Sequence, residues 1–206
     1  MTDLKNAYAL NAPADSKRLY ADWAGTYDEG FAQAMDYRLA RLVAFIYAEV
    51  GAGASPLLDV GAGTGLVAQN IPIKSGIEMD ALDLSAEMLE AAARKGLYRK
   101  LVEADLTRPL PLADNTYGAI VSAGTFTHGH VGPEPLDELL RVARKGAVFV
   151  LAINDQHFEG HGFAAKFDAL APRIDDAEFR KVRIYGEAPT GDHKDDEAQI
   201  AVFRKV

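Results

Sequence analysis

Three glycines at alternate positions are the first residues in this chain whose types and spacing could do chemistry. Gly61, Gly63 and Gly65 directly follow the apolar run Leu57–Val60, in the sequence LLDVGAGTG. Glycine allows a backbone to turn sharply and to approach a ligand that a Cβ atom would keep away. A helix that starts after the last glycine would add free N–H groups and a positive partial charge. The pattern predicts a loop that holds a polar ligand, with Asp59 just before the turn.

Acidic residues end the next two apolar runs. Asp83 lies 18 residues beyond Gly65, and Asp105 lies 22 residues beyond Asp83. A carboxylate at such a strand end can accept hydrogen bonds from both hydroxyls of a ribose, as it does in dinucleotide-binding folds. The glycine spacing differs from the G-x-G-x-x-G of those folds, because position 66 is Leu. Polar groups from successive strands are therefore expected at one edge of a sheet, where open α/β sheets bind ligands.

The elements that must position these residues alternate along the chain. From Leu57 onward, strand-like apolar runs alternate with amphipathic helical runs, which is typical of an α/β fold with a mostly parallel sheet. The predicted strands are Leu57–Val60, Glu78–Asp83, Lys100–Asp105, Ala119–Ala123, Ala147–Ile153, Phe179–Tyr185 and Ala198–Arg204. The predicted helices between the first five are Leu66–Ile71, Ala86–Lys95 and Glu134–Arg144. Because only a short stretch separates the last two strands, they should pair antiparallel, which leaves one reversed strand near an edge.

The first 54 residues contain no predicted strand. Apolar residues at helical spacing predict a packed helix from Leu39 to Val50. A segment dense in aromatic side chains precedes this helix, with Tyr20, Trp23, Tyr27, Phe31 and Tyr37. These rings either fix the N-terminal helices to the sheet or cover the ligand site as a lid. We therefore divide the chain into an N-terminal helical lid segment (1–54) and an α/β region (55–206), within one structural domain.

Composition excludes several classes of function. The formal net charge of −8 disfavours a nucleic-acid partner or an anionic membrane, since either would require a basic face. The absence of cysteine removes disulfides, thiolate metal sites and cysteine nucleophiles. The N-terminus has no apolar signal-peptide region, and no stretch approaches ~18 consecutive apolar residues. We expect a cytoplasmic monomer or homodimer without a bound metal.

The motifs between Leu57 and Ile153 resemble, in order and spacing, those of the class I S-adenosylmethionine-dependent methyltransferases. The resemblance implies a Rossmann-like fold and S-adenosyl-L-methionine as cofactor, with S-adenosyl-L-homocysteine as product. It implies that the glycine turn lies beneath the methionine and ribose part, that Asp83 holds the ribose and that Asp105 contacts the adenine amino group. The further cofactor-binding residues that we expect are Tyr27, Asp59, Ala62, Leu84, Met88, Leu106, Ser122, Ala123 and Gly124.

Three shorter stretches resemble small-molecule members of this family. Glu103–Leu112 looks like a D-x-x-x-L-P-F stretch, and Gly124–Glu134 is similar to the methyltransferase-like proteins named after the Williams–Beuren syndrome region. Tyr20–Asp28 resembles a Y-x-x-W-A-x-x-Y-D pattern whose segment closes over cofactor and acceptor in that group. Tyr117 is followed by Gly118 where the group often has an aromatic residue and Asp, so a structural contact is expected to be missing at that corner.

These resemblances and absences predict methyl transfer to an O or N atom of a small molecule. The missing cysteines remove the chemistry of cytosine-C5 and arsenite methyltransferases. We expect no extra domain that would read a polymer. Two alternatives stay open: a regulatory protein that binds the cofactor without turnover, and a nucleotide-dependent oxidoreductase on a related fold. The glycine spacing speaks against the oxidoreductase.

The candidate general base is His128, because imidazole accepts protons near neutral pH. The substrate-binding residues that we expect are Tyr20, Trp23, Thr125, His128, His130 and Asn154. The two histidines could instead only fix their loop, and Asn154 could be a turn residue at a strand end. His157 and His161 stand at helical spacing, and we expect them to begin a solvated helix rather than to bind a metal.

Overall fold

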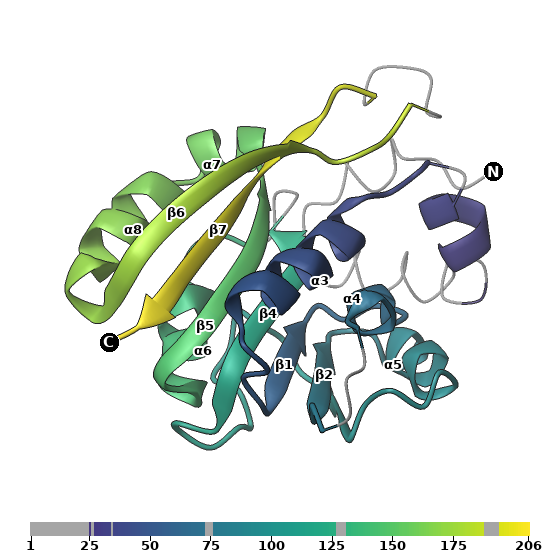
Figure 1. The fold of residues 1–206 in the computed structure, drawn as a ribbon, viewed down its shortest axis with the longest axis horizontal. Coiled ribbons are helices and arrows are strands. Elements are labelled where there is room, and N and C mark those ends of the chain that lie inside the picture. Colours follow the sequence, from purple (N-terminus) through teal and green to yellow (C-terminus); the bar gives the residue numbers. More distant parts are fainter. Residues whose placement is uncertain (1–24, 26, 34, 73–75, 127–130, 188–193) are drawn as a thin grey trace.

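One sheet of seven strands organises the chain, in the order β3-β2-β1-β4-β5-β7-β6 (Figure 1). The computed structural model describes residues 25, 27–33, 35–72, 76–126, 131–187 and 194–206. The strands are β1 (Leu57–Val60), β2 (Met79–Asp83), β3 (Lys100–Glu103), β4 (Tyr117–Phe126), β5 (Ala143–Asn154), β6 (Ile174–Arg183) and β7 (Glu197–Lys205). The first five strands pair in parallel, and β7 pairs antiparallel with both β5 and β6. The mostly parallel sheet with one reversed strand is confirmed.

Helices cover both faces of the sheet. One face packs against α3 (Leu39–Val50), α4 (Leu66–Asn70) and α5 (Ala86–Ala93). The other face packs against α6 (Pro135–Val142) and α8 (Phe163–Leu170), with α7 (Asp155–Gly160) beside them and the short η2 (Ala171–Arg173) after them. A seven-residue π-helical turn, η1 (Tyr27–Gln33), precedes α3.

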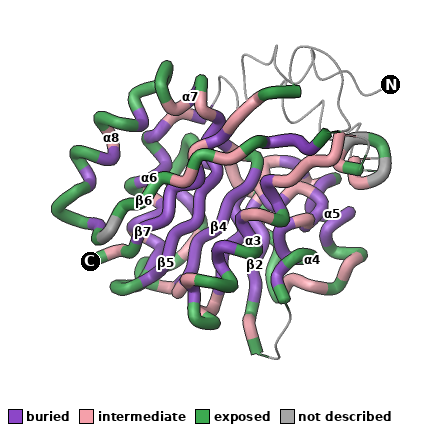
Figure 2. The backbone as a smooth tube through the Cα atoms, turned by 45° about the horizontal axis from the view of Figure 1, so that its top comes forward, coloured by how far each residue is buried: buried purple, intermediate pink, exposed green. Residues whose placement is uncertain are grey.

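The central strands are buried on both faces of the sheet because helices cover each face (Figure 2). All four residues of β1 are buried, with Leu58 and Val60 in one core and Leu57 in the other. This alternation follows from the two-residue period of a strand. Near-continuous apolar runs in the sequence are therefore what a doubly covered parallel sheet requires.

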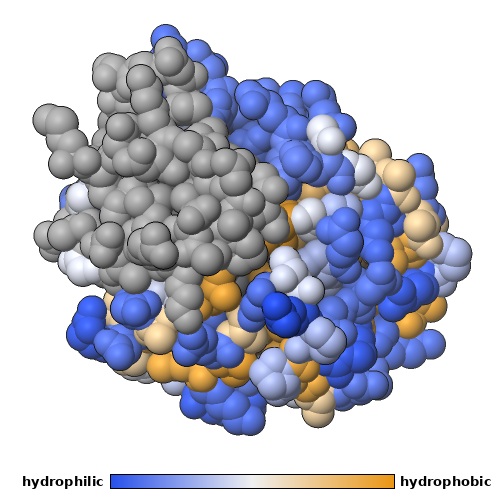
Figure 3. All heavy atoms as spheres, turned by 180° about the vertical axis from the view of Figure 1, so that it is seen from behind, coloured by the Kyte–Doolittle hydropathy of each residue, from blue (hydrophilic) through white to orange (hydrophobic). Residues whose placement is uncertain are grey.

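Surface properties agree with a well-covered core. Where Figure 3 is coloured, this side of the molecule is mostly hydrophilic, with apolar areas between the hydrophilic ones. The large apolar side chains exposed in the described part of the chain are Phe45, Leu101, Phe179 and Val206. Among the described helices, none combines the length and the apolar character that crossing a bilayer demands.

Element boundaries differ from expectation mainly where strand pairing extends an element. The predicted helix Glu134–Arg144 ends at Val142, because Ala143 already pairs with Tyr117 as the first residue of β5. β6 begins at Ile174 rather than at Phe179, since Ile174 pairs with Lys205 of β7. Neighbouring strands supply these hydrogen bonds, and local sequence preference does not report them.

Several hydrogen bonds hold the corner at Tyr117 and Gly118, and the expectation that one contact is missing there stays a prediction. The Gly118 amide donates to the Pro56 carbonyl at 2.8 Å. The buried Tyr117 hydroxyl donates to Asp80 Oδ2 at 2.9 Å, and Arg99 binds both oxygens of the same carboxylate. An acidic side chain from β2 therefore connects Tyr117 to Arg99 at this corner.

The buried Asp80 carboxylate gives a test of the fold. Replacing Arg99 with Met should lower the free energy of unfolding by about 2–3 kcal/mol, because the Asp80 side chain is only 1% exposed and would lose its cationic partner. Urea denaturation measures the change. Glu78→Gln is the matched control, since Glu78 pairs with the same arginine but is 56% exposed, and it should cost about 0.5 kcal/mol or less. Equal losses in the two variants would contradict the assignment.

Candidate active site

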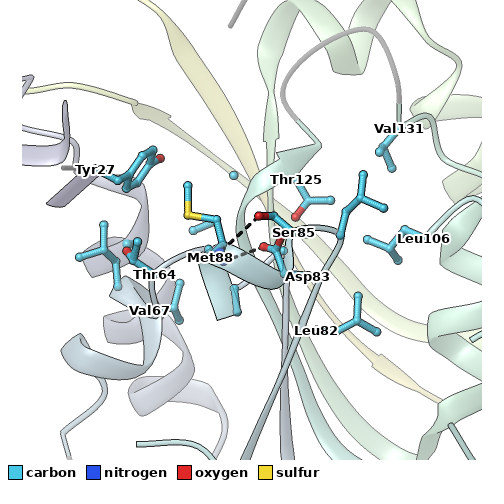
Figure 4. Close-up of a pocket in the computed structure, with 18 of the residues that line it drawn as sticks. Tyr27, Thr64, Val67, Leu82, Asp83, Ser85, Met88, Leu106, Thr125 and Val131 are labelled. Atoms are coloured by element: carbon cyan, nitrogen blue, oxygen red, sulfur yellow. Dashed lines mark hydrogen bonds between the residues drawn. The ribbon is translucent and has the colours of Figure 1, made fainter. Parts of the chain in front are cut away.

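The largest concentration of the predicted site residues lies in a pocket at the carboxyl ends of β1, β2 and β4 (Figure 4). The pocket has about 1050 Å³ of empty space, part of which is open to solvent. β1 lies between β2 and β4 in the sheet. From β1 the chain adds β2 and β3 on one side, and it then crosses to the other side of β1 to form β4. Such a point of reversed strand order is where open α/β sheets bind ligands.

Backbone hydrogen bonds hold the glycine turn onto β2. The amides of Gly61 and Ala62 both donate to the Leu82 carbonyl, at 2.7 and 3.0 Å. All three glycines have positive φ, at 64° for Gly61, 54° for Gly63 and 87° for Gly65. A residue with a Cβ atom rarely adopts this conformation, which is why glycine recurs in the turn. α4 has only five residues after the turn.

Asp83 connects the turn to the end of β2. Its Oδ2 accepts from the Gly63 amide at 2.7 Å, and its Oδ1 accepts from the Ser85 amide at 2.9 Å. Burial raises the pKa of Asp83, and these amide donors partly offset that rise. Because a carboxylate has about four acceptor positions, two amide bonds leave capacity for further donors from the pocket.

Gly61 and Gly63 do different work in the turn. A Cβ atom at Gly61 would lie 1.8 Å from Oγ1 of Thr125, whose hydroxyl donates to the Val60 carbonyl at 2.9 Å. A Cβ atom at Gly63 would have no heavy atom within 4 Å. Gly61 therefore permits close packing of the protein on itself, whereas Gly63 leaves open space that faces the pocket.

Apolar side chains form most of the remaining wall. Leu106 and Val131 lie on one side of the pocket and Tyr27 lies on the other, with Met88 nearer to Tyr27 (Figure 4). Asp105 also lines the pocket, and its Oδ1 accepts from the amide and the hydroxyl of Thr107 at 2.8 and 2.7 Å. An apolar slot with a few oriented polar groups is the usual form of a small-ligand site.

Most of the cofactor-binding residues expected from sequence line this one pocket. They are Tyr27, Gly61, Ala62, Gly63, Asp83, Leu84, Met88, Asp105, Leu106, Ala123 and Gly124, together with the proposed acceptor residue Thr125. Ser85 accepts from the Met88 amide at 3.2 Å and so begins α5 as its N-cap. This cap orients Met88 toward the pocket (Figure 4).

Four expected site residues do not line the pocket. Gly65 packs beneath the turn against Tyr98, and Ser122 is buried with its hydroxyl donating to the Val60 carbonyl at 2.8 Å. Asn154 is the N-cap of α7, since its Oδ1 accepts from the amides of Gln156 and His157. The fourth, Asp59, is fully buried below the turn. The side chains of Ser122, Asn154 and Asp59 thus make contacts within the protein, and the Gly65 backbone lies close to Tyr98.

Asp59 accepts a 2.6 Å hydrogen bond from the Tyr98 hydroxyl. Burial raises the pKa of Asp59 to about 7, and the nearby Asp83 carboxylate adds to this effect. Tyr98 follows α5, so the bond connects this helix to β1 directly below the glycine turn. Asp59 therefore belongs to the support of the site rather than to its surface.

Four of the residues expected at the acceptor side lie outside the described residues: Tyr20, Trp23, His128 and His130. Their roles stay predictions. The segment that carries the two histidines leads to Val131, which is described and lines the pocket. No group of three or more His, Asp or Glu side chains able to hold a metal occurs within the described ranges.

The expectation that His157 lies in a solvated helix start is wrong. His157 is only 4% exposed, and its Nε2 lies 2.8 Å from the Val131 carbonyl. Burial lowers the pKa of His157, which favours the neutral ring. His161 stays exposed, so only one of the two histidines enters the core. α7 thereby fixes the residue that forms one side of the pocket.

Several residues that line the pocket were not expected there from the sequence, among them Val131, Tyr37 and Thr64. Val131 lies within the stretch Gly124–Glu134 that resembles small-molecule family members, but its apolar type suggests no role of its own. Tyr37 was counted only among the aromatic residues, yet it lines the pocket and its hydroxyl donates to the Ala123 carbonyl at 2.7 Å. Thr64 lies inside the glycine motif, where its position between two glycines could have suggested a role for its hydroxyl.

Substitutions at the first two glycines of the turn, Gly61 and Gly63, should lower stability by different amounts. Gly61→Ala should destabilise the fold by about 2–3 kcal/mol, since strain at positive φ adds to the clash with Thr125. Gly63→Ala should cost about 1 kcal/mol, from φ alone, while it obstructs the open space. Thermal unfolding measures both. Adding Thr125→Ala should restore part of the stability of Gly61→Ala, and failure of this rescue would contradict the proposed clash.

The raised pKa of Asp59 predicts a pH-dependent stability. Between about pH 4 and 7 the folded state binds a proton that the unfolded state has lost, so the free energy of unfolding falls as pH rises. Asp59→Asn removes this loss, so its free energy of unfolding relative to wild type should rise by on the order of 4 kcal/mol between pH 4 and pH 8. Urea titrations at several pH values measure the difference. Asp83 contributes with the same sign in both proteins, so a pH-independent difference would overturn the assignment.

Comparison with known proteins identifies the family. A family profile described as "Methyltransferase domain" matches residues 58–151. Methyltransferase-like protein 27 of Homo sapiens is 30% identical over 152 residues, which cover 72% of this chain and 61% of that protein. Malonyl-[acyl-carrier protein] O-methyltransferase of Pectobacterium atrosepticum is 35% identical over 129 residues, 63% of this chain and 49% of that protein. The chain thus spans about half to three fifths of these relatives.

The fold agrees with these matches. The structure of a candidate S-adenosyl-L-methionine-dependent methyltransferase from Methanococcus maripaludis superposes with a TM-score of 0.59 at 16% identity, over 91% of this chain and 92% of that one. The human relative also bears out the similarity to the methyltransferase-like proteins of the Williams–Beuren region. Sequence and fold together show that this chain belongs to the class I S-adenosylmethionine-dependent methyltransferases.

Proposed function

We propose that this protein transfers a methyl group from S-adenosyl-L-methionine to an O or N atom of a small molecule. The observation that carries the proposal is the meeting of Asp83, the open face of Gly63 and an apolar slot in one pocket. Methyl transfer needs little covalent help from the protein, because the donor is already activated. Holding donor and acceptor in line is the main catalytic requirement.

The residues present fit the cofactor. The open space in front of Gly63 would let the cofactor lie close to the protein backbone. The Asp83 carboxylate could still accept hydrogen bonds from the two ribose hydroxyls. Leu84 and Leu106 offer apolar contact to the adenine ring, and Asp105 would accept from its amino group. When bound, the cofactor supplies a methyl group on a positively charged sulfonium.

The side chains around the reacting end act by placement. Tyr27 presents its ring to the pocket, where a cation would gain ~1–2 kcal/mol from the ring face once it is desolvated (Figure 4). The small residues Ala123 and Gly124 leave room for the methionine end. The Thr125 hydroxyl donates to the Val60 carbonyl, so its oxygen can accept a hydrogen bond from the O–H or N–H group of the substrate that is methylated. His128 is the proposed proton acceptor.

A small acceptor suits the chain better than a polymer. The net charge of −8 disfavours a polynucleotide. One relative is named as an O-methyltransferase, which supports an oxygen acceptor without excluding nitrogen. The cytoplasm is the proposed location, on the absence of cysteine. We retain the division into a helical segment (1–54) and an α/β region (55–206) as a proposal.

Cofactor binding tests the proposal directly. Calorimetric titration with S-adenosyl-L-homocysteine should give micromolar affinity for wild type, and Asp83→Ala should weaken it about 30-fold or more, because charge-assisted hydrogen bonds to the ribose are lost. Asp114→Ala is the matched control, since Asp114 is exposed and pairs only at the surface with Arg141. Binding of NAD in place of the homocysteine compound would overturn the methyltransferase proposal.

Turnover separates an enzyme from a cofactor-binding regulator. Incubation of the wild type with S-adenosyl-L-methionine and a panel of small hydroxy, carboxy and amino compounds should release S-adenosyl-L-homocysteine faster than the background without acceptor. Micromolar binding together with background release for every acceptor would favour the regulator.

A further inference from the structure

Asp28, in η1, bonds to two other parts of the fold. Its Oδ1 accepts from the Thr64 hydroxyl at 2.5 Å, and its Oδ2 accepts from the Lys95 ammonium at 2.6 Å. Thr64 lies within the glycine turn, and Lys95 lies just after α5. Lys95 also donates to Gln69 of α4 at 2.9 Å. One carboxylate therefore connects the N-terminal segment to the turn and, through Lys95, to the helices beside it.

The residue next to Asp28 faces the pocket. Tyr27 lies on the same side of the pocket as Thr64 and Met88 (Figure 4). At the other end of the same segment, the Tyr37 hydroxyl donates to the Ala123 carbonyl and the Arg38 amide donates to the Ile184 carbonyl. The segment is thus bonded to the sheet at Tyr37 and to the glycine turn at Asp28.

The two bonds of Asp28 differ in environment. Thr64 is only 3% exposed, so its hydroxyl bond to a carboxylate is shielded from water. The Lys95 and Asp28 side chains are 21% and 36% exposed, and water and salt weaken an ion pair of this kind. The Thr64 bond is therefore the stronger constraint, and it lies between Gly63 and Gly65 in the turn that would hold the cofactor.

We propose that Asp28 is a positioning residue for the cofactor: its bonds to Thr64 and Lys95 hold Tyr27 against the pocket and slow cofactor release. This inference rests on the proposed function for its ligand. Because the same turn contacts Asp28 and the cofactor site, order in the turn and placement of Tyr27 are coupled. A ligand that orders the turn then also favours the seated Tyr27, and the coupling is reciprocal.

Dissociation of S-adenosyl-L-homocysteine from the full chain, followed by stopped flow, tests the role. Asp28→Ala should accelerate release about tenfold or more, because both bonds are lost. Thr64→Val and Lys95→Met should each accelerate it about three- to fivefold. Thr64→Ser keeps the hydroxyl and should stay within about twofold of wild type. Asp36→Asn is the control on the same segment, since Asp36 pairs with Arg38 and not with the turn.

Hydrogen exchange of residues 27–33 in ligand-free protein gives a second readout that needs no cofactor. Exchange should be faster in Asp28→Ala and Thr64→Val, and unchanged in Thr64→Ser and Asp36→Asn. If wild type and all variants bind S-adenosyl-L-homocysteine and release it at the same rate, the role of Asp28 is overturned and the proposed function still stands. Unchanged hydrogen exchange in Asp28→Ala would overturn the role of Asp28, whether or not the cofactor binds. Absence of cofactor binding to wild type would refute the proposed function separately.

Discussion

The left-handed backbone of the turn after β1 is the constraint on which the rest of the site depends. Gly61, Gly63 and Gly65 all have positive φ, and this conformation turns two amides toward the Leu82 carbonyl and a third toward Asp83. The Val60 carbonyl at the start of the turn then accepts from hydroxyls of β4. One glycine-rich turn thereby brings the ends of three strands into a single wall.

Buried carboxylates on neighbouring strands support this wall by different means. Asp80 has a cationic partner in Arg99, Asp59 accepts from the Tyr98 hydroxyl, and Asp83 is held by backbone amides. Burial without a cationic partner raises the pKa of Asp59 to about 7. The carboxylate at the pocket itself is the one whose bonds to the protein leave it able to accept from a ligand.

The sheet and most of the pocket could be predicted from the sequence because their signals are local. Apolar runs, the glycine spacing and the acidic strand ends each report on a few consecutive residues. Asn154 and His157 could not be placed in this way. A polar residue at a strand end reads alike whether it faces a ligand or caps a helix, and His157 enters the core only because α7 packs beside Val131.

The sequence by itself determined the order in which the site residues follow one another along the chain: a glycine turn, then Asp83, then Asp105, each after an apolar run. These features follow from backbone sterics and from the two-residue period of strands, which act over short distances. Only the tertiary structure decided which polar groups are used internally. Thr64 meets Asp28 across 36 residues and Tyr98 meets Asp59 across 39, and such pairings depend on how helices pack, which no local pattern encodes.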